Sequence, residues 1–317
     1  MAGSLQGAAF SAEQLIRQRF RARQINLGAG DATRSALTGG YVSRFRGRGM
    51  DFAETRRYSP GDDVRLIDWR VTARTGDPHT KLFREERERP VFVVVDLNAS
   101  MFFGTRGAFK SVVAAECAAL ICWAAVAGGD RIGAVLITPS GNREVRPASG
   151  RRGALRVLQS LAACAHPSAA DHQPVSDALL NLRRVARPGS LIFVISDFYT
   201  LDSALERHLS RLRHHNDVLA CWIYDQVEAH CPPPGRYVVS DGTARATLDL
   251  ASAGQRRAYE GPFRARRERL TALCRDYRIP LLPIATGDDV VASLRQRVPG
   301  SSPGARAKRS TGSRDVA

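Results

Sequence analysis

VFVVVDLNAS (91–100) is the stretch that decides the fold. VFVVVD (91–96) is a continuous apolar run rich in β-branched side chains that ends in Asp96, and such a run is typical of a strand buried on both faces. Later runs have the same character: RIGAVLIT (131–138), LIFVISD (191–197) and VLACWIYD (218–225). Between these runs the patterns predict helices, at 107–127, 151–164, 174–186 and 202–213. Strands that alternate with helices form βαβ units, so we predict one mostly parallel sheet with helices on both faces.

Weaker patterns complete this prediction at the ends of the series. REVRPA (143–148) has the length and position of an edge strand, and PLLPIAT (280–286) of a short final strand after a helix near 254–277. In 235–249, Asp241-Gly242 lies between alternating runs and predicts a hairpin. Near the N-terminus, 11–24 predicts a helix with Ser11 as its N-cap and Gln14 completing a capping box.

The composition is that of a folded chain with a large positive charge. The 317 residues are 44% hydrophobic and carry a formal net charge of +16. Such a charge suits nucleic acid, an anionic membrane surface or an acidic partner. An Arg-rich composition inherited from a GC-rich genome explains the same numbers, so both interpretations stay open.

Cysteine usage and the absence of a targeting pattern indicate a soluble, cytoplasmic protein. The sequence has six Cys and no CxxC pair, which predicts buried free thiols in a reducing compartment. The first 20 residues lack the pattern of a signal peptide. The most apolar stretch, 117–129, is shorter than the roughly 20 residues that cross a bilayer, so we predict a buried helix there.

Acidic and polar side chains follow two of the predicted strands. Asp96, Asn98 and Ser100 follow the first, and Asp197 ends VISD. In open α/β sheets, ligands bind beyond the carboxyl ends of the strands. These oxygen ligands suit Mg²⁺ or Mn²⁺. Alternatively, Asp96 and Asp197 merely cap the segments that follow them.

Enzymatic interpretations find less support. A haloacid dehalogenase-type phosphatase needs a second Asp two positions after the first, and Asn98 stands there. An amide cannot transfer the proton that this chemistry requires. The sequence also lacks GxxxxGK[ST], and no GxGxxG follows a strand. We therefore expect a protein that is not an enzyme, with a metal-dependent hydrolase as a minor alternative.

The pattern Asp-x-Asn-x-Ser, with Asp197 after a later strand, resembles the metal-ion-dependent adhesion site of von Willebrand factor A-type domains. That site usually reads DxSxS, so Asn98 replaces the first Ser. It also takes a Thr from a later loop, whereas HQPVSDAL (172–179) offers only Gln173 or Ser176 nearby. The resemblance implies a degenerate site for Mg²⁺ or Mn²⁺ whose open position would recruit an acidic side chain of a partner.

A polar block identifies the family that the chain resembles. FAETRRY (52–58), PGDDVR (60–65) and IDWRVTAR (67–74) follow one another and resemble the "domain of unknown function 58" family. The family resembles von Willebrand A domains and is typically encoded beside MoxR-type AAA+ ATPases. Interleaved acids and guanidiniums in this block indicate either a structural ion-pair network or a recognition surface. The basic triplet Arg44, Arg46 and Arg48 is the expected partner-binding part.

These observations predict four segments. Residues 1–37 form an N-terminal helix and loop, 38–90 a family motif segment that docks on the sheet, 91–298 a von Willebrand factor A-like domain, and 299–317 a disordered basic tail. The resemblance implies a protein-binding adaptor or co-chaperone that works with a MoxR-type ATPase or its client. A nucleic-acid-binding protein is the main alternative, and its binding should fall steeply with salt.

Overall fold

The computed structural model describes residues 3–27, 50–59, 62–85, 88–166, 172–240 and 245–297. The chain divides into two compact units. We call Met1–Asp31 with Arg89–Ala317 the sheet unit, and Ala32–Glu88 the motif unit.

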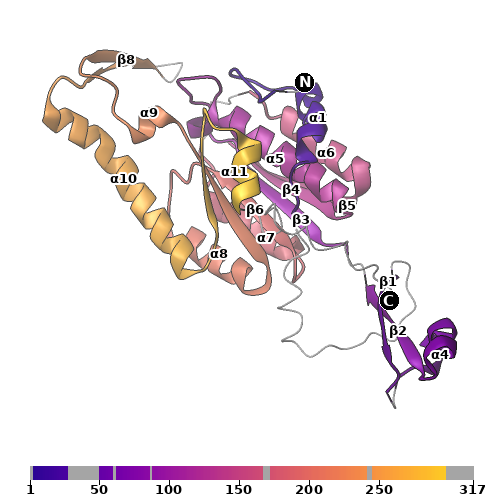
Figure 1. Cartoon of the computed structure of the whole chain (residues 1–317). Coiled ribbons are helices and arrows are strands. Elements are labelled where there is room, and N and C mark those ends of the chain that lie inside the picture. The colour runs from indigo at the N-terminus through magenta and orange to yellow at the C-terminus, as the bar shows by residue number, and fades with distance from the viewer. Residues whose placement is uncertain are drawn as a thin grey trace, which may run out of the picture. The chain divides into compact units, whose positions relative to one another are not determined.

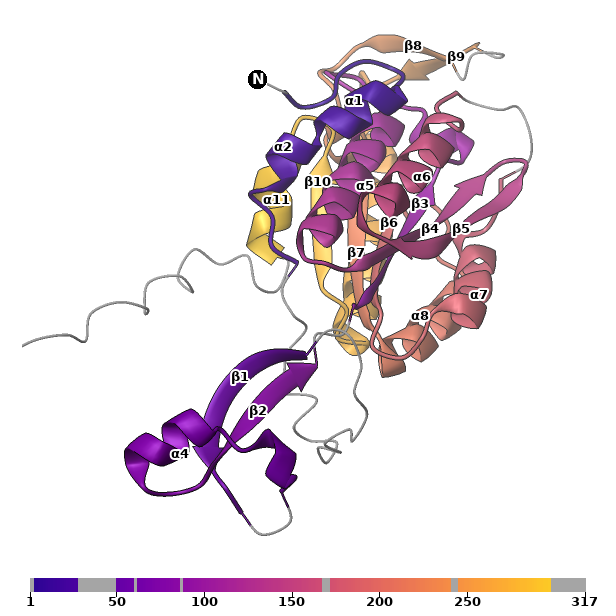
Figure 2. The ribbon, with the colours of Figure 1, turned by 90° about the vertical axis from the view of Figure 1, so that its right-hand side faces the viewer.

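The sheet unit (Figure 1) is built on a six-stranded sheet within the described residues, in the order β10-β7-β6-β3-β4-β5, which can be followed in Figure 2. Its strands, in chain order, are β3 Pro90–Asp96, β4 Arg131–Thr138, β5 Gly141–Ser149, β6 Leu191–Ser196, β7 Asp217–Tyr224 and β10 Leu281–Ala285. Neighbouring strands are parallel except that β5 runs antiparallel to β4 at one edge. The mostly parallel sheet predicted from the apolar runs is confirmed, and so is the edge strand.

Helices cover both faces of this sheet, as predicted (Figure 2). One layer contains α1 Ala12–Arg17, α2 Arg19–Ala22, α5 Lys110–Ala127, α6 Gly150–Ala162 and α11 Val290–Arg297. The other layer contains α7 Val175–Val185, α8 Ser203–His215 and α10 Ala253–Asp276. Each amphipathic helix turns an apolar stripe toward the sheet and a charged face to solvent.

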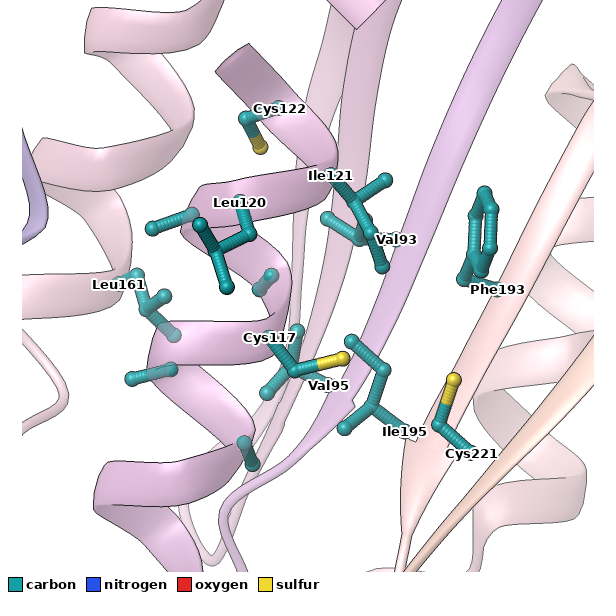
Figure 3. Packing of buried hydrophobic residues seen from close by; sticks show 14 of the residues in the cluster. Val93, Val95, Cys117, Leu120, Ile121, Cys122, Leu161, Phe193, Ile195 and Cys221 are labelled. Atoms are coloured by element: carbon teal, nitrogen blue, oxygen red, sulfur yellow. The ribbon is translucent and has the colours of Figure 1, made fainter. Parts of the chain in front are cut away.

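The central helix α5 is buried along almost its whole length. Figure 3 shows Cys117 and Ile121 of α5 facing Val93 and Val95 of β3, with Leu161 of α6 on another side of the helix. By length and composition α5 could cross a membrane, but 89% of its apolar window lies inside the protein. This burial agrees with the core helix predicted for the apolar stretch, and the cysteines are free thiols, as expected.

The N-terminal segment belongs to the sheet unit and packs on α5. Ser11 caps α1 and forms the predicted capping box with Gln14. The buried carboxylate of Glu116, on α5, accepts a hydrogen bond from the Leu5 backbone N at 2.7 Å and pairs with Arg21. Arg21 also pairs with Asp289 at 2.8 Å, just before α11. Segments from both ends of the chain are thus held on one helix by a single arginine.

The motif unit contains an antiparallel pair, β1 Met50–Arg57 and β2 His79–Glu85. The helical segments η1 Val64–Leu66 and α4 Trp69–Thr75 lie between them in sequence. These strands differ from the sequence-based expectation, which placed none here, because interleaved charges hide the period-2 pattern of a strand. Docking of the 38–90 segment on the sheet stays a prediction.

The charged residues of the motif unit have local structural roles. Asp63 caps η1, and Asp68 caps α4 by accepting from the backbone N of Arg70 and Val71. Arg56 pairs with Asp62 at 2.7 Å. Of the two interpretations of this block, these contacts favour the ion-pair and capping network.

Some predictions fall outside the described residues. These are the Arg44, Arg46 and Arg48 triplet, the tail 299–317 and the Asp241-Gly242 turn. The strands that flank this turn, β8 Arg236–Ser240 and β9 Arg245–Asp249, pair antiparallel as the alternating pattern predicts.

Candidate functional site

The candidate site lies where the winding direction of the sheet reverses. The first strand, β3, pairs with β4 on one side and with β6 on the other, so the chain winds outward in both directions from β3 and β6. Such a reversal opens a crevice at the carboxyl ends of the two strands, where α/β sheets bind ligands. Asp96 ends β3, and Asp197 directly follows β6. The two predicted carboxylates therefore come from adjacent strands at this position.

Both carboxylate oxygens of Asp96 accept hydrogen bonds inside the protein. Oδ1 accepts from the backbone N of Asn98 at 3.0 Å and from its side-chain Nδ2 at 2.7 Å. Oδ2 accepts from the Ser196 hydroxyl at 2.6 Å, across the β3–β6 boundary. Asp96 is only 1% exposed, so these bonds replace the water that a carboxylate normally has.

The side chain of Asn98 connects this carboxylate to the loop before α7. Its Nδ2 donates to the backbone O of Gln173 at 2.9 Å, and its Oδ1 accepts from the backbone N of Gln173 at 2.9 Å. An Asn can make this two-way contact because its amide both donates and accepts. Gln173, one of the two residues expected near the site, thus meets it through its backbone. Ser176, the other, donates to Asp202 at 3.4 Å instead.

Asp197 is paired with a lysine that the sequence analysis did not select. Lys110, the first residue of α5, donates to Asp197 Oδ2 at 2.9 Å and to Glu228 Oε1 at 2.9 Å. Glu228 lies on the short helix α9 Gln226–Ala229, which follows β7. The lysine side chain is 1% exposed and that of Asp197 is 2% exposed. A buried ammonium therefore joins the start of α5 to the segments after β6 and β7.

The backbone bends sharply after Asp197. Phe198 has a φ of 49°, in the left-handed region that side chains other than glycine rarely adopt. Phe198 itself is fully buried, its backbone N donates to the Ser196 hydroxyl, and the backbone N of Tyr199 donates to Asp197 Oδ1. Strained residues of this kind cluster at functional sites. The bend buries Phe198 and leaves Tyr199 59% exposed.

A third acid follows the next strand and has a structural role. Asp225, just after β7, accepts from the hydroxyls of Thr105 at 2.6 Å and Thr286 at 2.7 Å. It also caps α9 through the backbone N of Val227. Although burial acts to raise it, the pKa of Asp225 is lowered by these hydrogen bonds. This carboxylate stays ionised and ties three loops together at the carboxyl end of the sheet.

Burial and neighbouring charges set the protonation of the central groups. Burial raises the pKa of Asp96 to about 6, and the charge of Asp197 adds to this effect while hydrogen bonds from Ser196 and Asn98 oppose it. Burial acts to lower the pKa of Lys110, but the charges of Asp197 and Glu228 outweigh it and hold that pKa above its usual value. An amine held protonated in this way is a poor nucleophile.

The predicted ligand set does not fit a divalent ion in this arrangement. Oxygen ligands of Mg²⁺ or Mn²⁺ must converge on one point with free lone pairs. Asn98 Oδ1 instead accepts from Gln173, and Asp197 Oδ2 contacts an ammonium that would repel a cation. Within the described part of the chain, no group of three or more His, Cys, Asp or Glu has a metal-binding arrangement. The Ser100 hydroxyl is buried without a hydrogen-bond partner and is the single predicted ligand atom that stays unused among the described residues.

The structure thus gathers Asp96, Asn98 and Asp197, and adds Lys110, Ser196 and Glu228 to them. One signal in the sequence could have identified Lys110. It begins a helix that is otherwise almost entirely apolar, and a cation at a helix N-terminus opposes the helix dipole. A lysine in such a place needs carboxylate partners, which the tertiary structure supplies.

Comparisons with known proteins agree with this description. The "Uncharacterized protein Mb1516" of Mycobacterium bovis is 30% identical over 272 residues, which cover 86% of each chain. The same values hold for the "Uncharacterized protein Rv1480" of Mycobacterium tuberculosis. Among solved structures, the conserved hypothetical protein BatB of Bacteroides thetaiotaomicron is 12% identical, with a TM-score of 0.41, over 65% of this chain and 93% of that one.

The von Willebrand factor type A protein of Catenulispora acidiphila is also 12% identical, with a TM-score of 0.36, over 69% of this chain and 42% of that one. The predicted α/β fold class is confirmed: in the described residues a mostly parallel sheet lies between two helical layers. Residues 54–269, more than half of the chain, match the family described as "Protein of unknown function DUF58". The family expected from the polar block is therefore confirmed, and this chain belongs to it.

Proposed function

We propose that this chain is a non-catalytic protein-binding module, an adaptor or co-chaperone that works with a MoxR-type AAA+ ATPase or its client. The family membership motivates the choice of partner, through the gene association that the family resemblance implies. The observation that carries the binding role is a pair of exposed aromatic side chains at the carboxyl end of the sheet.

These aromatic residues are Phe103 and Tyr199, which are 40% and 59% exposed. Both belong to the buried charge network by direct contact. The Lys110 ammonium lies 5.8 Å from the centre of the Phe103 ring, and the Tyr199 backbone donates to Asp197. The guanidinium of Arg266, on α10, lies 4.5 Å from the centre of the Tyr199 ring. Aromatic and arginine side chains of this kind are enriched in the energetic centres of protein interfaces.

The buried groups that Phe103 and Tyr199 contact support a binding role over a catalytic one. The carboxylates of Asp96 and Asp197 accept hydrogen bonds or ion pairs from the protein, and the Lys110 amine is held protonated. A hydrolase would need a general base within reach of its substrate. Here the carboxylates hold loops in place, and the exposed side chains of Phe103 and Tyr199 are available for contact.

The test is a binding measurement with the purified MoxR-type ATPase of the same organism. Replacing both Phe103 and Tyr199 by Ala should weaken the complex by at least about tenfold, since truncating a central aromatic residue commonly costs more than 1 kcal/mol. Phe20→Ala is the matched control. This aromatic residue is 51% exposed, carries the Arg19 guanidinium 4.5 Å from its ring centre, and lies on α2.

Equal affinities for the double variant and the native protein would overturn the proposed binding surface. The nucleic-acid alternative rests on the net charge of +16. It would be supported if the native protein does not bind the ATPase but binds a labelled oligonucleotide with an affinity that falls steeply as the salt concentration rises.

A further inference from the structure

We propose that the ammonium of Lys110 supplies, from within the chain, the positive charge that a divalent ion would supply at this site. The proposed binding surface of Phe103 and Tyr199 is then held in place without a metal. This inference rests on the proposed function, since it states how the proposed binding edge is held together. Its central test needs no partner, so the two can fail separately.

The first step of the argument is the position of the ammonium. Lys110 Nζ lies 2.9 Å from an oxygen of Asp197, the acid that follows β6 at the reversal of the winding direction. It lies at the same distance from Glu228, after β7, and it faces the ring of Phe103, after β3. A single cation thus contacts the segments that follow three parallel strands, as a shared metal ion would.

The second step is the balance of charge. Asp197 and Glu228 both face Lys110, and the negative charge of Asp197 acts on the buried Asp96. Carboxylates this close to one another repel unless a cation lies between them. Within the described residues, Asp197 and Glu228 both form their ion pairs with Lys110. Removing that charge would leave the buried carboxylate of Asp197 and the partly exposed carboxylate of Glu228 without a cation.

Neither the start of a helix nor a buried position favours a lysine by itself. Lys110 begins α5, where the helix dipole disfavours a cation, and it is buried, which disfavours any charge. The neighbouring residues of α5 are apolar or small. The contacts with the two carboxylates outweigh both penalties, which indicates that the role of Lys110 is to neutralise them.

The proposal has a consequence that distinguishes Lys110 from the lysine of an ordinary structural salt bridge. If Lys110 replaces a cation, taking its charge away should make this position accept one. Asp197 and Glu228, whose oxygens each lie 2.9 Å from the ammonium, would then offer two carboxylate oxygens at the vacated position. Hard oxygen donors of this kind bind Mg²⁺ and Mn²⁺.

The experiment compares thermal unfolding of the native protein and of Lys110→Met, with chelator and with millimolar Mn²⁺ or Mg²⁺. Methionine keeps the length of the side chain and removes its charge. The native melting temperature should be the same with chelator and with metal. The variant should melt lower and regain roughly 5–10 °C at a hundredfold excess of metal over its dissociation constant.

Two further variants complete the design. In Lys110→Met with Asp197→Asn, the acquired response to metal should disappear, because a carboxylate ligand is lost. If Lys110→Met does not fold, Lys110→Arg keeps the proposal testable, since it should fold and stay indifferent to metal.

Titration of the native protein with Mn²⁺, followed by calorimetry, gives the opposing outcome. Binding that Asp197→Asn abolishes would show that the native site takes a metal beside Lys110, and would overturn the proposal. A Lys110→Met variant that is as stable as the native protein and indifferent to metal would overturn it as well. If the native protein is indifferent to metal but does not bind the ATPase, this inference would still hold and the proposed partner would be wrong.

Discussion

The buried ion pair of Lys110 with Asp197, at the carboxyl edge of the sheet, and the ion pairs of the motif unit are alike in kind but differ in their surroundings. At the edge, the side chains of Lys110 and Asp197 are 1% and 2% exposed. In the motif unit, those of Arg57 and Asp77 are 77% and 49% exposed. Water and salt screen the second pair, whereas the first pair has only protein around it. Burial, and not the number of pairs, should therefore decide which charges the fold depends on.

The largest effect should come from removing the buried cation. Lys110→Met should lower the free energy of unfolding of the sheet unit by about 3–5 kcal/mol, because it leaves the buried carboxylate of Asp197 without its cation. Urea unfolding without metal measures this loss. A loss below about 1 kcal/mol would mean that the buried pair contributes no more to stability than an exposed pair. It would contradict the idea that burial decides which charges the fold depends on.

A smaller effect concerns Asp96, whose pKa burial raises from 3.8 to about 6. The folded state then holds a proton that the unfolded state has released, so stability is favoured at low pH and falls as pH rises between about 4 and 6. Asp96→Asn should remove this contribution. Relative to the native protein, the variant should gain on the order of 2–3 kcal/mol between pH 4 and pH 7.

Urea unfolding of both proteins at a series of pH values measures that difference. A difference between the two that stays constant from pH 4 to pH 7 would show that Asp96 is not proton-linked to folding.

In the motif unit, the largest single effect should come from a helix cap and not from an ion pair. Asp68 accepts hydrogen bonds from the first backbone N–H groups of α4. Asp68→Ala should cost about 1 kcal/mol, the usual cost of losing an N-cap. Hydrogen exchange of the α4 amides reports this change locally, and Asp68→Asn, which can still cap, is the control that should keep most of the protection.

The smallest effect should come from the exposed pair itself. A double-mutant cycle of Arg57→Ala and Asp77→Ala should give a coupling energy between 0 and about 1 kcal/mol, lower at high salt. Hydrogen exchange of the β1 and β2 amides measures it. A coupling above about 2 kcal/mol would mean that this pair is buried in solution, against some other surface.

Several features of this protein were determined by the sequence alone. The runs at 91–96, 131–138 and 191–197 correspond to β3, β4 and β6. They were recognisable because a strand buried on both faces is apolar along most of its length. The Ser11 capping box could also be predicted from the sequence, since all its atoms lie within four consecutive residues. The prediction of a parallel sheet also placed Asp96 and Asp197 at the same edge, whereas the structure showed that their strands, β3 and β6, are neighbours.

The role of those acids was decided only by the tertiary structure. Lys110 meets Asp197 across 87 residues of sequence, and Asn98 meets Gln173 across 75. No local pattern specifies such contacts, because they depend on how the helices and loops close over the sheet after the strands have taken their order. The sequence alone does not show whether a metal, an ammonium or a hydroxyl will face a given carboxylate. Here the fold brought a lysine to Asp197 and the hydroxyl of Ser196 to Asp96.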